Sequence, residues 1–341
     1  MFVIYVIMIT NDQFDLFKKE FEYIVDTYKK KYSIKPVYDY KSYEQLLARR
    51  FKAVARDLSA LIEEAYNMIS IDNKIGRPAK INEKQKLSIL LLKEIFHLSN
   101  RRMSKFLSFF KLLTGIEISY KTVEKTYSDP ILIMMMHNIF VIIIKRKNIT
   151  TTDITGDGTG YSLSITRHYR TLREREGDKI KEYPVKMKEK KKQFAYSFAI
   201  MDLDTKLYVG YGTSMRSERD AYNKAMIMLK ELGLKINSAR LDQYYSGQSI
   251  TGDYPEDATI YIIPKKNATI QGPVKWKEMI KYLMEDPYKY LKEYFRRENS
   301  ETGFSVDKRE FGWDISQRRE DRISTAQICI GTLHNIFLMG E

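Results

Sequence analysis

The chain has 341 residues, of which 43% are hydrophobic, so it can bury a core and is not expected to be disordered. Its 58 lysines and arginines exceed its 44 acidic residues and give a formal charge of +14, which favours a polyanionic partner such as nucleic acid. One cysteine and four scattered histidines exclude an internal disulfide and a cysteine-based zinc site, so any metal is expected to be held by oxygen ligands.

Two apolar segments raise the question of a leader or a membrane span. Residues 1–9 have no basic start and no small-residue cleavage site, so we expect a short strand there rather than a signal peptide. Residues 131–144 are fewer than the roughly 20 that cross a bilayer, so we expect a buried helix or strand. We therefore expect a cytoplasmic protein with no membrane partner.

The first zone, residues 1–75, is mostly helical in pattern, and the sequence does not indicate its role. Apolar side chains recur at helical spacing over residues 43–68 and form one face that suits packing or a partner subunit.

The second zone, residues 76–130, predicts a helix-turn-helix DNA-binding region. Three short helices are expected after the helix-breaking Gly-Arg-Pro at 76–78, over residues 83–96, 101–113 and 120–127, the last two capped by Ser99 and Ser119. On the last helix, the residues expected to face DNA are Lys121, Thr122 and Lys125. An ordinary three-helix packing unit with solvated lysines is the alternative.

The third zone, residues 131–341, alternates strands and helices and predicts a mixed α/β domain. Strands are expected over residues 149–156, 194–202, 207–213, 236–241 and 259–263. Helices are expected over residues 218–232, from 275 onward, and over 323–338. A lysine-rich run at 186–192 is expected in a loop, where it is either solvated or holds phosphates nonspecifically.

Two aspartates follow predicted strands. Asp157 is expected at the end of the strand over 149–156, and Asp242 at the end of the strand over 236–241. Carboxylates at the ends of separate strands meet at one edge of a sheet, where α/β folds bind ligands. Taken singly, such an aspartate is more often a turn former or helix cap, and Asp153 is an alternative to Asp157.

A third carboxylate lies among cations at helical spacing. If one helix carries Tyr294, Arg297, Glu301 and Lys308, they share an arc of roughly 60°. A glutamate flanked by cations suits a site that holds a metal ion and DNA phosphates. A solvated face with an Arg297–Glu301 ion pair explains the pattern equally well. The residues around Glu301 are poor helix formers, which leaves the regularity of this helix open.

The spacing Tyr294-x2-Arg297-x3-Glu301-x6-Lys308 resembles the Tyr/Arg/Glu/Lys motif of a superfamily of bacterial and archaeal insertion-sequence DDE transposases. The segments Asp-Gly-Thr-Gly at 157–160 and Asp-Gln-Tyr-Tyr-Ser at 242–246 resemble the two aspartate motifs of these enzymes. The likeness covers about residues 76–335 and implies an RNase H-like catalytic domain, a mixed sheet flanked by helices, after a helix-turn-helix region.

The resemblance also implies roles for individual residues. Asp157, Asp242 and Glu301 would hold Mg²⁺ or Mn²⁺ and carry the chemistry, while Tyr294, Arg297 and Lys308 would contact the DNA end. From its place just past a strand, Lys265 is expected to contact phosphate.

The expected function is a transposase that binds terminal inverted repeats as a homodimer or higher assembly. It would cleave at the element ends and join the 3′ ends to target DNA by two-metal phosphoryl transfer. A catalytically silent DNA-binding regulator and a metal-dependent DNA nuclease of the same fold are the alternatives.

Overall fold

The computed structural model describes residues 9–32, 39–70, 79–164 and 194–340. The expected N-terminal strand, apart from its last residue, the helix-breaking triplet at 76–78 and the lysine-rich run at 186–192 lie outside the described residues.

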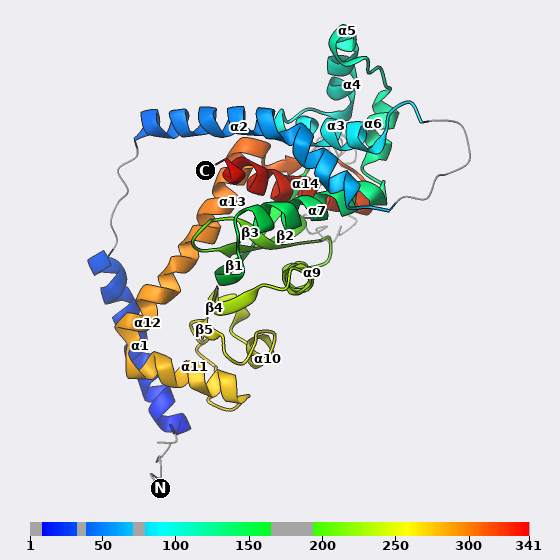
Figure 1. The fold of residues 1–341 in the computed structure, drawn as a ribbon. Helices are drawn as coiled ribbons and strands as arrows, with labels where there is room; N and C mark the ends of the chain where they lie inside the picture. The colour runs from blue at the N-terminus through cyan, green and yellow to red at the C-terminus, as the bar shows by residue number, and fades with distance from the viewer. Residues whose placement is uncertain (1–8, 33–38, 71–78, 165–193, 341) are drawn as a thin grey trace, which may run out of the picture.

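A six-stranded mixed sheet forms the centre of the described chain (Figure 1). Its strands are β1 (Thr151–Leu163), β2 (Phe194–Asp202), β3 (Tyr208–Ser214), β4 (Lys235–Leu241), β5 (Thr259–Tyr261) and β6 (Asp314–Ile315). The order is β3-β2-β1-β4-β5, and β6 pairs with β1. Strands β1 to β3 are antiparallel neighbours, whereas β4 is parallel to both β1 and β5. The predicted α/β class is confirmed, and the mixed sheet is consistent with an RNase H-like fold.

Helices precede and flank this sheet. The N-terminal ones are α1 (Asn11–Tyr32), α2 (Tyr40–Asn67), α3 (Glu83–Ile95), α4 (Asn100–Phe109), α5 (Lys111–Thr114), α6 (Tyr120–Thr126) and α7 (Pro130–Arg146). Those that follow are α9 (Glu218–Glu231), α10 (Gln248–Thr251), α11 (Val274–Glu285), α12 (Pro287–Tyr294), α13 (Glu298–Phe311) and α14 (Glu320–Met339). Two short 3-10 helices are η1 (Gln243–Tyr245) and η2 (Phe295–Arg297).

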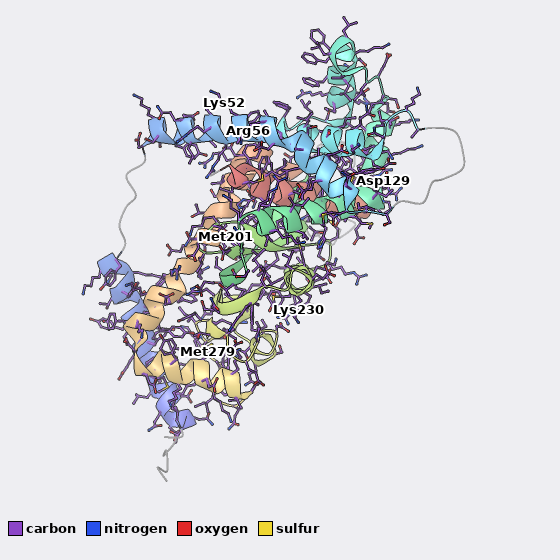
Figure 2. All side chains as sticks on the ribbon, in the orientation of Figure 1. Lys52, Arg56, Asp129, Met201, Lys230 and Met279 are labelled. Carbon is purple, nitrogen blue, oxygen red and sulfur yellow. The ribbon has the colours of Figure 1, made fainter. Side chains whose placement is uncertain are left out.

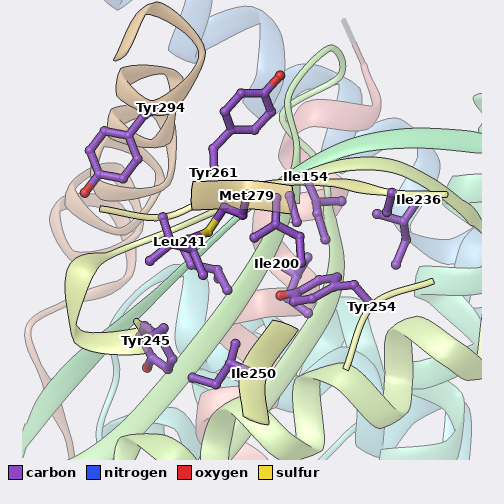
Figure 3. Packing of buried hydrophobic residues seen from close by; sticks show 14 of the residues in the cluster. Ile154, Ile200, Ile236, Leu241, Tyr245, Ile250, Tyr254, Tyr261, Met279 and Tyr294 are labelled. Carbon is purple, nitrogen blue, oxygen red and sulfur yellow. The ribbon is translucent and has the colours of Figure 1, made fainter. Parts of the chain in front are cut away.

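Both faces of the sheet are buried. In β2, Phe198 and Ile200 belong to the core that includes α9, whereas Ala199 and Met201 pack with Phe140 of α7. The alternation follows from the two-residue repeat of a strand. The core on the α9 side continues past β4 and β5 onto α11 and α12, where Figure 3 shows Leu241, Tyr261 and Met279 packed together.

Helix α2 is amphipathic, as the sequence predicts for residues 43–68. Its buried residues Val54, Leu58 and Leu61 join the core formed with α7 and α14. Lys52 and Arg56 lie on its exposed side (Figure 2). The helix is therefore held by burial of one apolar stripe.

The segment from α3 to α6 has a small core of its own, made of Ile81, Ile89, Met103, Leu107, Ile118 and Val123. Ser99 and Ser119 cap α4 and α6 as predicted. The single helix expected over residues 101–113 is wrong, because the chain breaks into α4 and α5 at Phe110. Phe110 leaves helical geometry where its ring packs on Phe106, 4.7 Å between centroids.

The apolar segment over residues 131–144 forms most of α7, a largely buried helix. Among the described residues no single helix is long and apolar enough to cross a membrane, although α6 and α7 together pass that test as a pair bent by 57°.

Candidate active site

Asp157 lies within β1 and not at its end, so the predicted strand boundary is wrong. β1 pairs with β4 only as far as Gly156, which faces Leu241, but it continues beside β2 to Ser162. Asp157 is thus the first residue of β1 past the end of β4. The strand runs on because β2 remains a hydrogen-bonding partner, which the spacing of apolar residues in β1 does not reveal.

Asp242 follows β4 directly, as predicted. It caps η1, and its side chain accepts a hydrogen bond from the backbone N–H of Tyr244 at 3.2 Å. The pairing of β1 with β4 ends at Gly156 and Leu241, and each aspartate is the next residue of its chain segment. The two aspartates therefore lie at one edge of the sheet.

The segment with the third carboxylate is not one continuous helix. α12 ends at Tyr294, the 3-10 turn η2 follows, and α13 begins at Glu298, so the argument from a single 60° face is wrong. Short polar side chains explain the break: Asn299 donates to the carbonyl of Arg296 at 2.6 Å and Ser300 to that of Arg297 at 2.7 Å. Such bonds compete with regular helix geometry.

Arg297 nevertheless joins the acidic residues. Its Nη1 lies 2.7 Å from Oε1 of Glu301, and its Nη2 lies 3.6 Å from Oδ1 of Asp242. The guanidinium also stands over the ring of Tyr294, 5.5 Å from the centroid. The predicted ion pair between Arg297 and Glu301 is therefore present, and it extends to the second aspartate.

Hydrogen bonds tie the start of α13 to β1. The hydroxyl of Thr155 lies 3.4 Å from both the carbonyl oxygen of Arg297 and the hydroxyl of Ser300. Thr155 is two residues before Asp157 and completely buried. These contacts fix the helix that carries Glu301 against the strand that carries Asp157.

The environment of Asp157 raises the pKa of its carboxyl group. Burial raises the pKa of this carboxyl to about 6, the negative charges of Glu301 and Asp242 act in the same direction, and the N–H of Gly158 and the charge of Arg297 oppose them.

The donor set suits a hard divalent cation, because all three side chains offer carboxylate oxygens. Within the described ranges, no three acidic, histidine or cysteine side chains lie close enough to hold a metal ion in this conformation. Arg297 occupies that role electrostatically, and in the part of the chain that is described its buried Nε has no hydrogen-bond partner. The residues fit such an ion by the chemistry of their donor atoms.

Lys308 lies beside the residues that follow Asp157, and Tyr294 lies beside Arg297. Nζ of Lys308 donates to the hydroxyl of Thr159 at 2.6 Å and to the carbonyl of Gly160 at 3.1 Å, just past Asp157. Burial lowers the pKa of Lys308. Tyr294 is only 3% exposed and contacts Arg297, so in this DNA-free conformation it is covered.

The remaining expected DNA contacts lie elsewhere. Lys265 follows β5 and lies over the ring of Tyr244, in the turn after Asp242. Lys121, Thr122 and Lys125 are on α6, which packs on α3 and α4 rather than on the sheet edge with Asp157 and Asp242. The two lysines are exposed, while Thr122 is half-buried beside its cap.

The alternative first aspartate has another role. Asp153 accepts a hydrogen bond from Ser238 and lies 3.9 Å from Arg240, away from Arg297 and its partners.

Two further side chains, Glu218 and Arg240, lie beside the site and were not expected from the sequence. Glu218 lies against Gly158, and the buried Arg240 joins β4 to α12 through Glu293 at 2.5 Å. An arginine between the apolar Ala239 and Leu241 of the predicted strand is the signal that points to Arg240, since a buried charge needs a partner. Glu218 has no comparable signal.

Comparison with known proteins gives one clear relationship. No protein-family model matches the chain. Over 282 residues it is 42% identical to the probable transposase for insertion sequence element ISA1214 of Archaeoglobus fulgidus, an alignment that spans 83% of each protein.

Proposed function

This chain belongs to the insertion-sequence transposases, and from that premise we propose that it cuts DNA at the ends of a mobile element and joins the freed 3′ ends to target DNA. The observation that supports the chemistry is that Arg297 contacts both Asp242, at the end of β4, and Glu301 of α13, while the charges of all three act on Asp157 of β1. Asp157, Asp242 and Glu301 are the proposed catalytic residues.

The same three residues would hold Mg²⁺ or Mn²⁺. When bound, such ions supply Lewis-acid activation of the attacking oxygen and neutralise charge on the leaving oxygen. The pKa of Asp157, raised to about 6 by burial, still leaves this carboxylate mostly ionised and able to bind a cation at neutral pH.

Cationic side chains would position the DNA backbone. Arg297 balances the carboxylates in the metal-free protein, and its planar guanidinium also suits a phosphate. Lys308, held by Thr159, stands beside Asp157 on the other side of the same edge. Lys265 would contact phosphate next to Asp242.

Recognition of the element ends would use α6. Lys121 and Lys125 are exposed on this helix, which suits a contact with terminal inverted repeats. A homodimer or higher assembly would hold two ends together, because joining both ends to one target requires them in one complex.

The test is a cleavage and strand-transfer assay with candidate DNA ends and Mg²⁺. We expect the wild type to give both cut and joined products, and Asp157→Asn, Asp242→Asn and Glu301→Gln to bind DNA but lose both. The matched control is Glu310→Gln on the same helix as Glu301, whose carboxylate accepts from Tyr43 instead.

Each other outcome contradicts part of the proposal. Cut but unjoined DNA identifies a nuclease. DNA binding with neither product, in the wild type, identifies a silent regulator. Full activity in Asp157→Asn shows that the catalytic site lies elsewhere.

A further inference from the structure

A fourth acidic side chain, Glu218, lies against the backbone next to Asp157. Glu218 is in the first turn of α9, just after the capping Ser217. A Cβ atom placed on Gly158 would be 2.2 Å from Cδ and 2.4 Å from Oε1 of Glu218. Glycine at position 158 therefore leaves the space that this carboxylate fills, and any larger residue would displace it.

The same carboxylate binds the turn that follows Asp242. The hydroxyl of Tyr245 donates to Oε1 of Glu218 at 2.5 Å. The Tyr245 ring is 1% exposed and packs edge-on against Phe198, 5.2 Å between centroids. Burial, and then the hydrogen bond to Glu218, raise the pKa of Tyr245, so the phenol stays protonated and donates.

We propose that Glu218 is a positioning residue that sets the spacing between Asp157 and Asp242. It touches Gly158, the neighbour of Asp157, and holds Tyr245, three residues after Asp242. β1 and β4 no longer pair beyond Gly156 and Leu241, so backbone hydrogen bonds between these strands do not reach the aspartates. The Glu218–Tyr245 contact supplies a link at that point.

A purely helical role does not account for these contacts. An acidic residue in the first turn stabilises a helix without needing a tyrosine or a glycine opposite it. Asp220 occupies the same turn and pairs with Lys224 at 3.0 Å, so it serves as the matched control.

The inference rests on the proposed function, and its test measures metal binding as well as DNA cleavage. Mn²⁺ binding to the full-length, metal-free protein is measured by electron paramagnetic resonance, and the Mg²⁺ dependence of cleavage in parallel. Glu218→Ala and Tyr245→Phe are expected to weaken Mn²⁺ binding about 10-fold and to raise the Mg²⁺ requirement similarly, as loss of outer contacts does at metal sites. DNA binding and the behaviour of Asp220→Asn are expected to match the wild type.

Glu218→Gln separates positioning from direct ligation. The amide oxygen still accepts from Tyr245, so this variant is expected to bind Mn²⁺ within about twofold of the wild type, since an outer hydrogen bond is kept. A loss as large as that of Glu218→Ala would overturn the positioning role, because it would show that the charge itself is required.

A double variant tests the contact with Gly158. Gly158→Ala alone forces Glu218 away and strains β1, so it is expected to bind Mn²⁺ more weakly than Glu218→Ala. In Gly158→Ala/Glu218→Ala the added methyl group has space, and binding is expected to return to the level of Glu218→Ala. A double variant as weak as Gly158→Ala would contradict the contact.

Asp157→Asn distinguishes the two proposals. If Asp157→Asn does not cut and Glu218→Ala and Tyr245→Phe bind Mn²⁺ like the wild type, only the role of Glu218 fails. If Asp157→Asn cuts normally, the proposed catalytic site fails first.

Discussion

Arg297 is the cation that pairs with two of the three proposed catalytic carboxylates. Its guanidinium lies 2.7 Å from Glu301 and 3.6 Å from Asp242. A monovalent cation on a side chain that is 19% exposed offsets only part of three nearby carboxylates. Burial raises the pKa of Asp157 to about 6, and the negative charges of Glu301 and Asp242 contribute to this rise.

This imbalance makes Asp157 destabilising in the metal-free protein. A rise in its pKa from 3.8 to about 6 corresponds to at most about 3 kcal/mol, and partial solvent access reduces it to roughly 1–3 kcal/mol. The folded state binds the proton more tightly than the unfolded state, so the cost is absent below about pH 4, grows up to about pH 6 and stays constant above it. We expect Asp157→Asn to be more stable than the wild type at pH 7.5 and equally stable at pH 4, by urea denaturation without metal.

If the proposed site binds Mn²⁺, the cation is expected to reverse that order of stability at pH 7.5. Binding would stabilise the folded wild type, and this gain is expected to shrink in the asparagine variant. Equal urea midpoints for both proteins at pH 7.5 in the absence of metal would contradict the assigned environment of Asp157.

At the scale of elements, α13 is anchored by a buried polar network as well as by its contact with β1. Asp307 accepts from the hydroxyl of Tyr208 and contacts Nδ1 of His334, both at 2.7 Å. Nε2 of His334 lies 3.0 Å from the carbonyl of Lys206. α13, the β2–β3 turn and α14 are thereby joined behind the helix face that carries Glu301.

Removal of the Asp307 carboxylate is therefore expected to destabilise the fold. Asp307→Ala leaves Tyr208 and His334 buried without their partner, at a cost of roughly 2–4 kcal/mol. Urea denaturation measures this loss. Glu310→Gln, on the same helix but facing α2, is expected to change stability by less than about 0.5 kcal/mol. Equal stability of the two variants would show that the network does not hold α13.

Close packing of α9 on β3 depends on Gly212. A Cβ at this position would be 2.0 Å from the carbonyl oxygen of Ala221 and 2.5 Å from the backbone nitrogen of Ala225. Backbone atoms cannot rotate away, so helix and strand must separate. We expect Gly212→Ala to cost about 3 kcal/mol or more, seen as a lower melting temperature.

Gly252→Ala is the matched comparison, because the nearest atom to its Cβ is 3.5 Å away. It is expected to melt like the wild type. A Gly212→Ala protein that also melts like the wild type would show that α9 sits farther from β3.

Sequence patterns identified elements better than their limits. β2, β4 and α14 follow directly from apolar spacing and turn residues, whereas the segment that forms α7 was expected as either a helix or a strand. The break at η2 depends on side-chain bonds of Asn299 and Ser300 that apolar spacing does not reveal. The continuation of β1 past Asp157 depends on a partner distant in the chain, β2. Glu218 was missed for the same reason: only folding places α9 over Gly158, and no spacing in the sequence links them.

At the scale of the whole molecule, β1, the end of β4 and α13 bring Asp157, Asp242 and Glu301 into one region, where the charges of the last two act on Asp157. The expected DNA-reading helix α6 belongs to a separate small core. Arg322 of α14 pairs with Glu124 of α6, so the two parts are in contact. The whole chain, including residues outside the described ranges, carries a formal charge of +14, which suits contact of both parts with DNA. DNA bound across them would be held largely through phosphates, whose neutralisation releases counterions.

Binding of DNA ends is therefore expected to weaken steeply with salt, and α6 is expected to supply part of that dependence. Each phosphate contact adds about 0.9 to the slope of log affinity against log salt, so Lys121→Ala/Lys125→Ala should lower the slope by about 2. Lys230→Ala, an exposed lysine of α9, is the control and should leave it unchanged. Asp157→Asn should also keep the wild-type slope, because it alters the chemistry and not the phosphate contacts. Fluorescence anisotropy at several salt concentrations measures this slope. An unchanged slope in the double variant would show that α6 does not contact the DNA.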